Sequence, residues 1–365
     1  MFMPADKDNK IPKIGVIGIG GAGGNAINRM IEKKLSNVDF IVVNTDIQAL
    51  ENSLSKNKIQ IGPKLTNGMG AGGNPDIGKR AAEESIDEIS SAIEGLDMLF
   101  ITAGMGGGTG TGGAPVIANI SKNFEILTVG VTTTPFKFER SKRMKNAEIG
   151  LTKLKDVVDT LIVIPNEKLM TILPPNATLD EALSLVDDVL YKAVKGIIEL
   201  VTKSGLINVD FADVMTVMRE KGSALISLAE ATGENRGRKA AEMAISNPLI
   251  DDFDIRKAKA LLLNISIPPN TPFLEATEPL NYITEQLETK DPNIIFGVVE
   301  DESLEDSISV TIIATGIPEQ KIESQDLISD GIVYMPYKNV ETNKLPDPSQ
   351  LDTPAYKRYN KNKAD

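Results

Sequence analysis

The stretch TAGMGGGTGTGGAP, residues 102–115, restricts the fold more than any other part of the sequence. Seven of its fourteen residues are glycine, and ordering a glycine costs roughly 0.5–1 kcal/mol more than ordering an alanine. The stretch lies between an apolar run at 97–104 and a run at 114–123, where we predict a strand and a helix. Backbone N–H groups at such a junction form an anion-binding nest, to which Thr109 and Thr111 add hydroxyl donors. The composition therefore predicts a backbone shaped around a bound anion.

Two further segments are rich in glycine. Residues 18–25 (GIGGAGGN) match the pattern G-x-G-x-x-G between a predicted strand at 13–20 and a predicted helix at 26–35. Residues 66–80 (TNGMGAGGNPDIGKR) contain G-x-x-x-x-G-K, but Arg80 stands where a magnesium-binding hydroxyl would be needed. We interpret this second segment as a glycine loop that precedes a helix at 76–93, with Asn74 or Asp76 near the helix cap.

Strands and helices alternate through the first half of the chain. The predicted strands, which include 39–46 and 125–135, are apolar throughout, as is typical of a parallel sheet covered on both faces. The three glycine loops would then lie at the carboxyl edge of the sheet, where open α/β sheets bind ligands. Three converging loops suit a nucleoside triphosphate better than a dinucleotide, although the first loop alone also fits an NAD-dependent dehydrogenase.

The longest predicted helix covers 177–203, with capping-box spacing at 178–181 and a stop at Gly205. At about 40 Å it would span a domain and join two of them. The pattern after it predicts a smaller α+β domain, in which alternation in the last strand indicates one less buried face. Its predicted strands are 223–229, 258–267, 293–300 and 307–317, and its helices fall near 236–246 and 275–289.

These patterns divide the chain into six segments. We predict a disordered N-terminus at 1–12, a nucleotide-binding domain at 13–176, a central helix at 177–205, a C-terminal α+β domain at 206–317, a flexible linker at 318–350 and a tail at 351–365.

Composition limits the chemistry. The chain has no Cys and no His, which excludes thiolate and imidazole catalysis and metal sites built from those residues. Its formal net charge of -12 disfavours binding to nucleic acid. Residues 1–10 lack the apolar core of a secretory signal, and no apolar run approaches the roughly 18 residues that cross a bilayer. We therefore expect a cytoplasmic protein.

The segment GGGTGTG at 106–112 resembles the signature loop of the tubulin/FtsZ family. The resemblance continues over roughly residues 12–317, with matching segments at 15–30, 43–50, 70–85, 133–139, 208–214 and 240–249. It implies an α/β fold in which a Rossmann-like parallel-sheet GTPase domain is joined by a long central helix to a smaller α+β domain. It also implies a GTPase that polymerises head-to-tail with copies of itself, forming the bacterial division ring on the inner face of the membrane.

The resemblance further implies a ligand, GTP or GDP with Mg2+, and a set of residues that bind it. The phosphate-binding positions of the family match Gly20, Gly21, Ala22, Gly23, Gly24, Asn25, Ala71, Gly72, Gly73, Gly104, Gly107, Gly108, Thr109 and Gly110. Glu139 and Arg143 match ribose contacts, while Asn166 and Asp187 match guanine readers. Where the family usually has an aromatic residue facing guanine, this chain has Leu183. We expect that loss of stacking to lower nucleotide affinity by about 0.5–1.5 kcal/mol.

The segment NVDFADV at 208–214 carries the expected catalytic groups. Asp210 and Asp213 are three positions apart and can share one face of a helical turn. The resemblance implies that both aspartates polarise the attacking water in the nucleotide site of the next subunit, and that Asn208 contacts the nucleotide there. The active site would then be complete only in a polymer. A filament protein that binds GTP with little hydrolysis stays open as an alternative.

The tail at 351–362 (LDTPAYKRYNKN) resembles the family's short partner-binding peptide in a diverged form. The resemblance implies docking on membrane-anchor and regulatory division proteins. The chain has no amphipathic anchor of its own, so we expect no direct membrane insertion.

Overall fold

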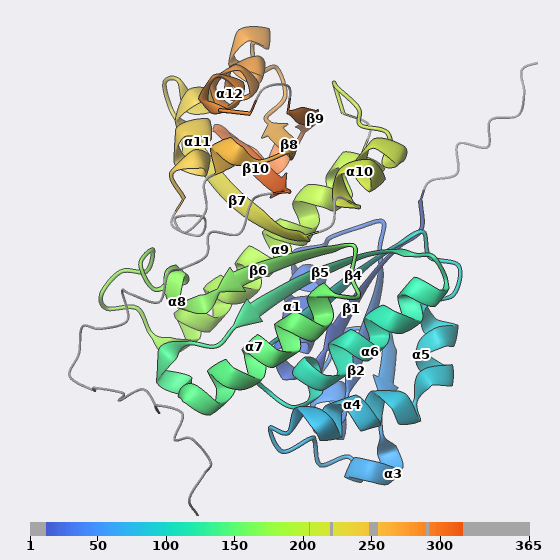
Figure 1. Ribbon diagram of the computed structural model, residues 1–365. Coiled ribbons are helices and arrows are strands. Elements are labelled where there is room, and N and C mark those ends of the chain that lie inside the picture. Colours follow the sequence, from blue (N-terminus) through green and yellow to red (C-terminus); the bar gives the residue numbers. More distant parts are fainter. Residues whose placement is uncertain (1–11, 204, 220–221, 248–254, 290–291, 317–365) are drawn as a thin grey trace, which may run out of the picture. The chain divides into compact units, whose positions relative to one another are not determined.

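The computed structural model describes residues 12–203, 205–219, 222–247, 255–289 and 292–316. The predicted linker and tail, and all but the last residue of the predicted N-terminal segment, lie outside these ranges. The strands in them are β1 (Ile14–Ile19), β2 (Asp39–Asn44), β3 (Asn57–Gln60), β4 (Met98–Gly104), β5 (Leu127–Thr134), β6 (Thr160–Pro165), β7 (Gly222–Thr232), β8 (Ala260–Ile267), β9 (Asn293–Glu300) and β10 (Ser307–Thr315). They form one sheet in the order β3-β2-β1-β4-β5-β6-β7-β10-β8-β9 (Figure 1).

The helices surround this sheet. They are α1 (Gly20–Glu32), α2 (Ile47–Glu51), α3 (Pro63–Thr66), α4 (Pro75–Glu84), α5 (Ile86–Ile93), α6 (Thr109–Asn123), α7 (Ser141–Lys155), α8 (Asn166–Leu169), α9 (Leu179–Thr202), α10 (Phe211–Met218), α11 (Arg236–Ile245) and α12 (Phe273–Gln286). Short 3-10 turns include η1 (Lys137–Glu139) and η4 (Glu302–Leu304).

The first six strands are parallel and the inner ones are covered on both faces, as predicted, whereas the edge strand β3 is partly exposed. All six residues of β1 are buried, because a strand between two helical layers has no solvent-facing side. Alternate residues of β1 belong to different cores: Ile17 and Ile19 pack with α4–α7, whereas Ile14 and Val16 pack with α1 and α9. Figure 1 shows α4, α5, α6 and α7 on one side of these strands.

The remaining strands form the α+β part. β10 pairs antiparallel with β7 and β8, and β9 pairs parallel with β8. β6 pairs parallel with β7 over 160–162, so the sheet continues from one part into the other. The expectation of a less buried face on the last strand is wrong. β10 is central, and its two faces pack against the α11 side and the α9 side, so it is buried along nearly all of its length.

Helix boundaries differ most from the prediction in three helices. The helix expected at 76–93 is two helices, because Ser85 leaves the helical conformation with φ -115° and ψ 31°. Its hydroxyl instead accepts a hydrogen bond from the Gly62 N–H at 3.2 Å. α1 and α6 begin inside their glycine loops, at Gly20 and Thr109, so the glycines form the first helical turns rather than preceding them.

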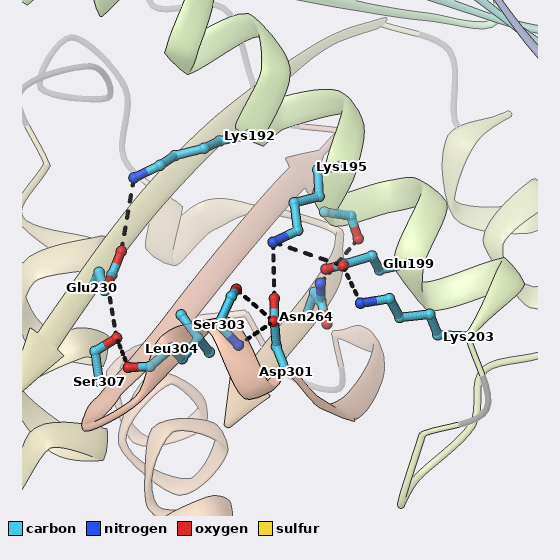
Figure 2. A network of polar contacts seen from close by, with 11 residues as sticks. Lys192, Lys195, Glu199, Lys203, Glu230, Asn264, Asp301, Ser303, Leu304 and Ser307 are labelled. Carbon is cyan, nitrogen blue, oxygen red and sulfur yellow. Dashed lines mark hydrogen bonds and ion pairs between the residues drawn. The ribbon is translucent and has the colours of Figure 1, made fainter. Parts of the chain in front are cut away.

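α9 confirms the predicted long helix. The Thr178 hydroxyl accepts from the Glu181 N–H, and the Glu181 carboxylate accepts from the Thr178 N–H, which is the expected capping box. Its 24 residues extend about 36 Å. Its second half is tied to the α+β part: Lys195 Nζ donates to the Asp301 carboxylate at 2.9 Å and lies 3.8 Å from Glu199 (Figure 2). Lys203 also pairs with Glu199.

Candidate nucleotide site

A cleft of about 430 Å³ opens at the carboxyl ends of β1, β4 and β5. It brings together most of the predicted nucleotide-binding positions, which lie on β4, the loop before α6, η1 and the helices α1, α6, α7, α8 and α9. These are Gly20, Gly21, Ala22, Asn25, Gly104, Gly107, Gly108, Thr109, Gly110, Glu139, Arg143, Asn166 and Asp187. The rest of its wall includes Met105 and residues 133–136, which sequence reasoning did not assign although 133–139 was among the matching segments.

Five predicted positions, Gly23, Gly24 and 71–73, do not line this cleft. A Cβ at Gly23 would lie 2.5 Å from the Thr102 carbonyl oxygen, so this glycine allows α1 to pack on β4. Ala71 packs against the loop before α6, because a Cβ at Gly108 would lie 2.8 Å from that of Ala71. The exposed glycines 72 and 73 both have positive φ and continue this loop.

The expected phosphate side of the cleft is bare backbone at the starts of two helices. A Cβ placed on Gly21 or Gly107 would meet no atom within 4 Å. No side chain of the described residues caps α1 or α6, whereas Asn74 caps α4 through a hydrogen bond from the Asp76 N–H. The first N–H groups of α1 and α6 are therefore available to an anion, which the helix dipoles also attract. The Asn74 cap also confirms that the second glycine segment precedes a helix.

The opposite side of the cleft holds two polar groups suited to a ligand. Desolvation by burial raises the pKa of Asp187 to about 7, although the nearby Arg29 charge acts in the other direction. The Asn166 side-chain oxygen is buried and has no hydrogen-bond partner in the described part of the chain. Buried polar atoms are rarely left unpaired, so the Asn166 oxygen indicates a polar ligand. Guanine carries adjacent N–H donors, from which a carboxylate can accept hydrogen bonds.

The cleft wall also contains a charged pair from η1 and α7. Arg143 and Glu139 form an ion pair, and the Glu139 carboxylate also accepts from the Phe136 N–H at 3.0 Å. The backbone thus holds Glu139 at the cleft wall. Leu183 lines the same cleft with 47% of its surface exposed, so it offers an apolar rim without an aromatic face.

Asn208, Asp210 and Asp213 do not join the cleft of their own chain. Asp210 caps α10 by accepting from the Ala212 N–H at 3.4 Å, and Asp213 follows in the first turn of that helix. The Asn208 side chain accepts from the Gly205 N–H at 2.7 Å. Along α9, Asp187 and Thr202 are separated by about 22 Å. All three predicted catalytic residues are exposed at the far end of that helix.

Comparison with known proteins assigns the family. The model of the Tubulin/FtsZ family GTPase domain matches residues 13–174, and that of the FtsZ family C-terminal domain matches 222–318. The cell division protein FtsZ of Rickettsia typhi is 46% identical over 349 residues, covering 95% of this chain and 77% of the relative.

The chain belongs to the FtsZ family.

As an FtsZ-family protein it is a GTPase that forms filaments in cell division, which overturns the dehydrogenase alternative. FtsZ of Wolbachia sp is 49% identical over 326 residues, covering 86% of this chain and 82% of the relative. A solved FtsZ dimer from M. jannaschii is 44% identical, with a TM-score of 0.81, covering 88% of this chain and 96% of that one. CetZ2 from Haloferax volcanii, at 20% identity and a TM-score of 0.72, shares the fold. None of the helices described is long and apolar enough to cross a membrane.

Proposed function

We propose that GTP occupies the cleft and is hydrolysed only when the 208–214 loop of the next subunit closes over it. One observation carries this proposal: the cleft and the exposed aspartates lie at opposite ends of α9, too far apart to act within one chain. A head-to-tail contact between two copies brings the two halves together, and repetition of a heterologous contact extends a filament.

In this proposal different groups of the chain bind the phosphates, the ribose and the base, and orient the attacking water. Backbone N–H groups at the starts of α1 and α6 bind the phosphates, with the 71–73 loop nearest the γ-phosphate. Glu139 and Arg143 hold the ribose side, while Asn166 and Asp187 read guanine. Asp210 and Asp213 of the neighbouring copy orient water toward the γ-phosphate, and Asn208 contacts the nucleotide. Such positioning is the main requirement of phosphoryl transfer.

Mg2+ fits this arrangement as a partner of the nucleotide. Among the described residues no three acidic side chains gather into a metal site. Mg2+ commonly keeps several waters and binds through substrate phosphates with one or two carboxylates, so the phosphates in the cleft and the incoming aspartates would supply its ligands. When bound, it would neutralise phosphate charge.

Substitution of a loop aspartate tests the proposal. We expect Asp213→Ala to lower phosphate release by at least about 100-fold, because a positioned acid/base group contributes about that much or more, while GTP still binds. The control is Thr216→Ala, an exposed position one turn further along α10. Phosphate release and nucleotide binding are measured in parallel. Turnover at the wild-type rate in Asp213→Ala would contradict the catalytic role, and a wild-type chain that assembles with GTP without releasing phosphate would favour the non-hydrolysing filament.

We further propose that the protein acts in the cytoplasm at the division site, on the inner face of the membrane. The tail at 351–362 would dock on membrane-anchor and regulatory division proteins. A chain ending at residue 350 should then hydrolyse GTP normally in solution and fail to localise in cells.

A further inference from the structure

Thr45 lies beside the phosphate side of the cleft without lining it. It follows β2, and its side chain is fully buried. Its hydroxyl oxygen is 2.7 Å from that of Thr109, which does line the cleft. β2 and β4 flank β1 in the sheet, so this contact passes over the end of β1. Gly20 occupies that point with φ +73°, and a Cβ on it would lie 3.4 Å from the Thr109 Cβ.

The chemistry of two paired hydroxyls sets the direction of this hydrogen bond once a phosphate is present. Each hydroxyl carries one hydrogen, and a fully ionised phosphate oxygen only accepts. If the Thr109 hydroxyl donates to a phosphate, the hydrogen between the two threonines must come from Thr45. A chain of donors that runs one way strengthens each of its bonds. Thr45 would therefore orient the Thr109 hydrogen toward the cleft.

The backbone of Thr45 contacts the neighbouring glycine loop as well. Its carbonyl oxygen accepts from the Thr66 hydroxyl and from the Gly70 N–H, each at 3.3 Å. The next residue, Asp46, forms a β-bridge with Met69. Thr45 thus joins the base of the loop that carries residues 71–73 to the first residue of α6.

We propose that Thr45 is a positioning residue for phosphate binding, acting through the Thr109 hydroxyl. This rests on the proposed role of Thr109 as a phosphate ligand. Because Thr45 touches no part of the cleft that would hold the base, it affects nucleotides and not the bare nucleoside.

A double-mutant cycle on Thr45→Val and Thr109→Val tests this. Affinities for GTP, GDP and guanosine are measured by calorimetry at protein concentrations too low for assembly. We expect Thr45→Val to weaken GTP and GDP binding about 5- to 10-fold, the range of one hydrogen bond, and to leave guanosine binding unchanged. Thr45→Ser, which keeps the hydroxyl, restores affinity. Adding Thr45→Val to Thr109→Val has no further effect, because the residue then has nothing to orient.

The outcomes separate the two proposals. Unchanged affinity in Thr109→Val overturns its role as a phosphate ligand. Weakened binding in Thr109→Val with normal binding in Thr45→Val overturns the positioning role alone. Two results would show that Thr45 acts by stabilising the folded structure and would also overturn the positioning role. One is a loss of guanosine binding in Thr45→Val, and the other is an effect of Thr45→Val that is just as large when the Thr109 hydroxyl is absent. If Thr45→Val does not fold, Thr45→Ala removes the hydroxyl without a second methyl group and must reproduce the pattern.

Discussion

Two neighbouring aspartates on α9 differ in what surrounds them. Asp188 accepts two hydrogen bonds from the Arg29 guanidinium, at 2.7 and 2.9 Å, and these hold its pKa below the ordinary value. Asp187 faces the cleft, and burial raises its pKa to about 7. The Asp188 carboxylate therefore links α9 to α1, whereas the Asp187 carboxylate faces the cleft, where a ligand could donate to it.

The pKa of Asp187 predicts a pH dependence for guanine nucleotide binding. In the proposed site only the ionised carboxylate would accept hydrogen bonds from both guanine N–H donors. We therefore expect the Kd for GDP to rise about tenfold for each pH unit below 7 and to level off above it. Calorimetry between pH 5.5 and 8 measures this. Asp187→Asn should bind weakly at every pH, whereas Asp180→Asn, an exposed carboxylate on the same helix, should keep the wild-type profile.

The same group acts on stability with the opposite sign. The folded state holds the Asp187 proton more tightly than an unfolded chain with a pKa near 3.8. The free energy of unfolding of the nucleotide-free protein should therefore fall as the pH rises from about 4 to about 7. Asp187→Asn should be more stable than wild type above pH 7. A mutant less stable at pH 8, or a flat binding profile in the wild type, would show that this carboxyl does not titrate as the cleft implies.

Among the elements, the close contact of α4 with α6 requires glycines, of which Gly112 on α6 is one. A Cβ at Gly112 would lie 2.0 Å from the Pro75 carbonyl oxygen and 2.5 Å from the Lys79 nitrogen, both backbone atoms that cannot rotate away. We expect Gly112→Ala to lower the free energy of unfolding by about 1–3 kcal/mol, as overpacking does. At Gly113 the nearest atom to an added Cβ is 3.4 Å away, so Gly113→Ala should be neutral or slightly stabilising. Urea unfolding followed by circular dichroism compares the two, and equal losses would contradict the packing argument.

The attachment of α9 to the α+β part is also testable, with two lysines one turn apart. Burial opposes ionisation of Asp301, but hydrogen bonds from Ser303 and Lys195 lower its pKa to about 2. We expect Lys195→Met to lower the free energy of unfolding by about 2–4 kcal/mol, because it strands a buried carboxylate. Lys192→Met breaks only the more exposed pair with Glu230 and should lose less than about 1 kcal/mol.

Figure 2 shows both lysines of this comparison. The Asp301 contribution is present above pH 3.8 and is lost as the pH falls through 2, so the difference between the two variants should be constant from pH 5 to 9. Similar losses in Lys192→Met and Lys195→Met would show that the buried carboxylates do not depend on Lys195.

How far the sequence predicts these elements depends on whether the signal is local. α9 was predicted nearly to its ends, because periodicity and a capping box both lie within the helix. The break at Ser85 was missed because its partner, the Gly62 N–H, lies 23 residues away. The glycine loops predicted an anion site, whereas the burial of Asp187 and the hydroxyl partner of Thr109 arise only when distant strands and helices meet. The guanine readers followed from family resemblance alone.

At the scale of the whole molecule, the separation of cleft and aspartates predicts an activity that depends on assembly. GTP turnover per molecule should collapse below a threshold protein concentration, because an isolated chain holds only half of the proposed site. Phosphate release measured over a dilution series tests this. A constant turnover per molecule down to high dilution would contradict the shared site.

A mixture of wild-type and Asp213→Ala chains tests the shared site more directly. Wild-type chain held below its threshold should regain turnover when Asp213→Ala chain is added in excess, because each wild-type loop then meets an intact cleft on a mutant neighbour. Turnover per wild-type molecule should approach its value in wild-type filaments. Continued inactivity of such mixtures, with assembly verified by light scattering, would contradict a site shared between neighbouring chains.

The separation of cleft and loop along α9 also determines how many complete sites a filament contains. A filament of n copies on the proposed mechanism contains n − 1 complete sites, since the last cleft at one end meets no loop and the last loop at the other end meets no cleft. The end subunit with the open cleft keeps its GTP until another copy arrives. The two ends of the filament therefore differ chemically although every chain in it is identical. On this mechanism, hydrolysis in a cleft begins only after the next copy has bound, so the nucleotide in each subunit depends on how long ago its neighbour was added.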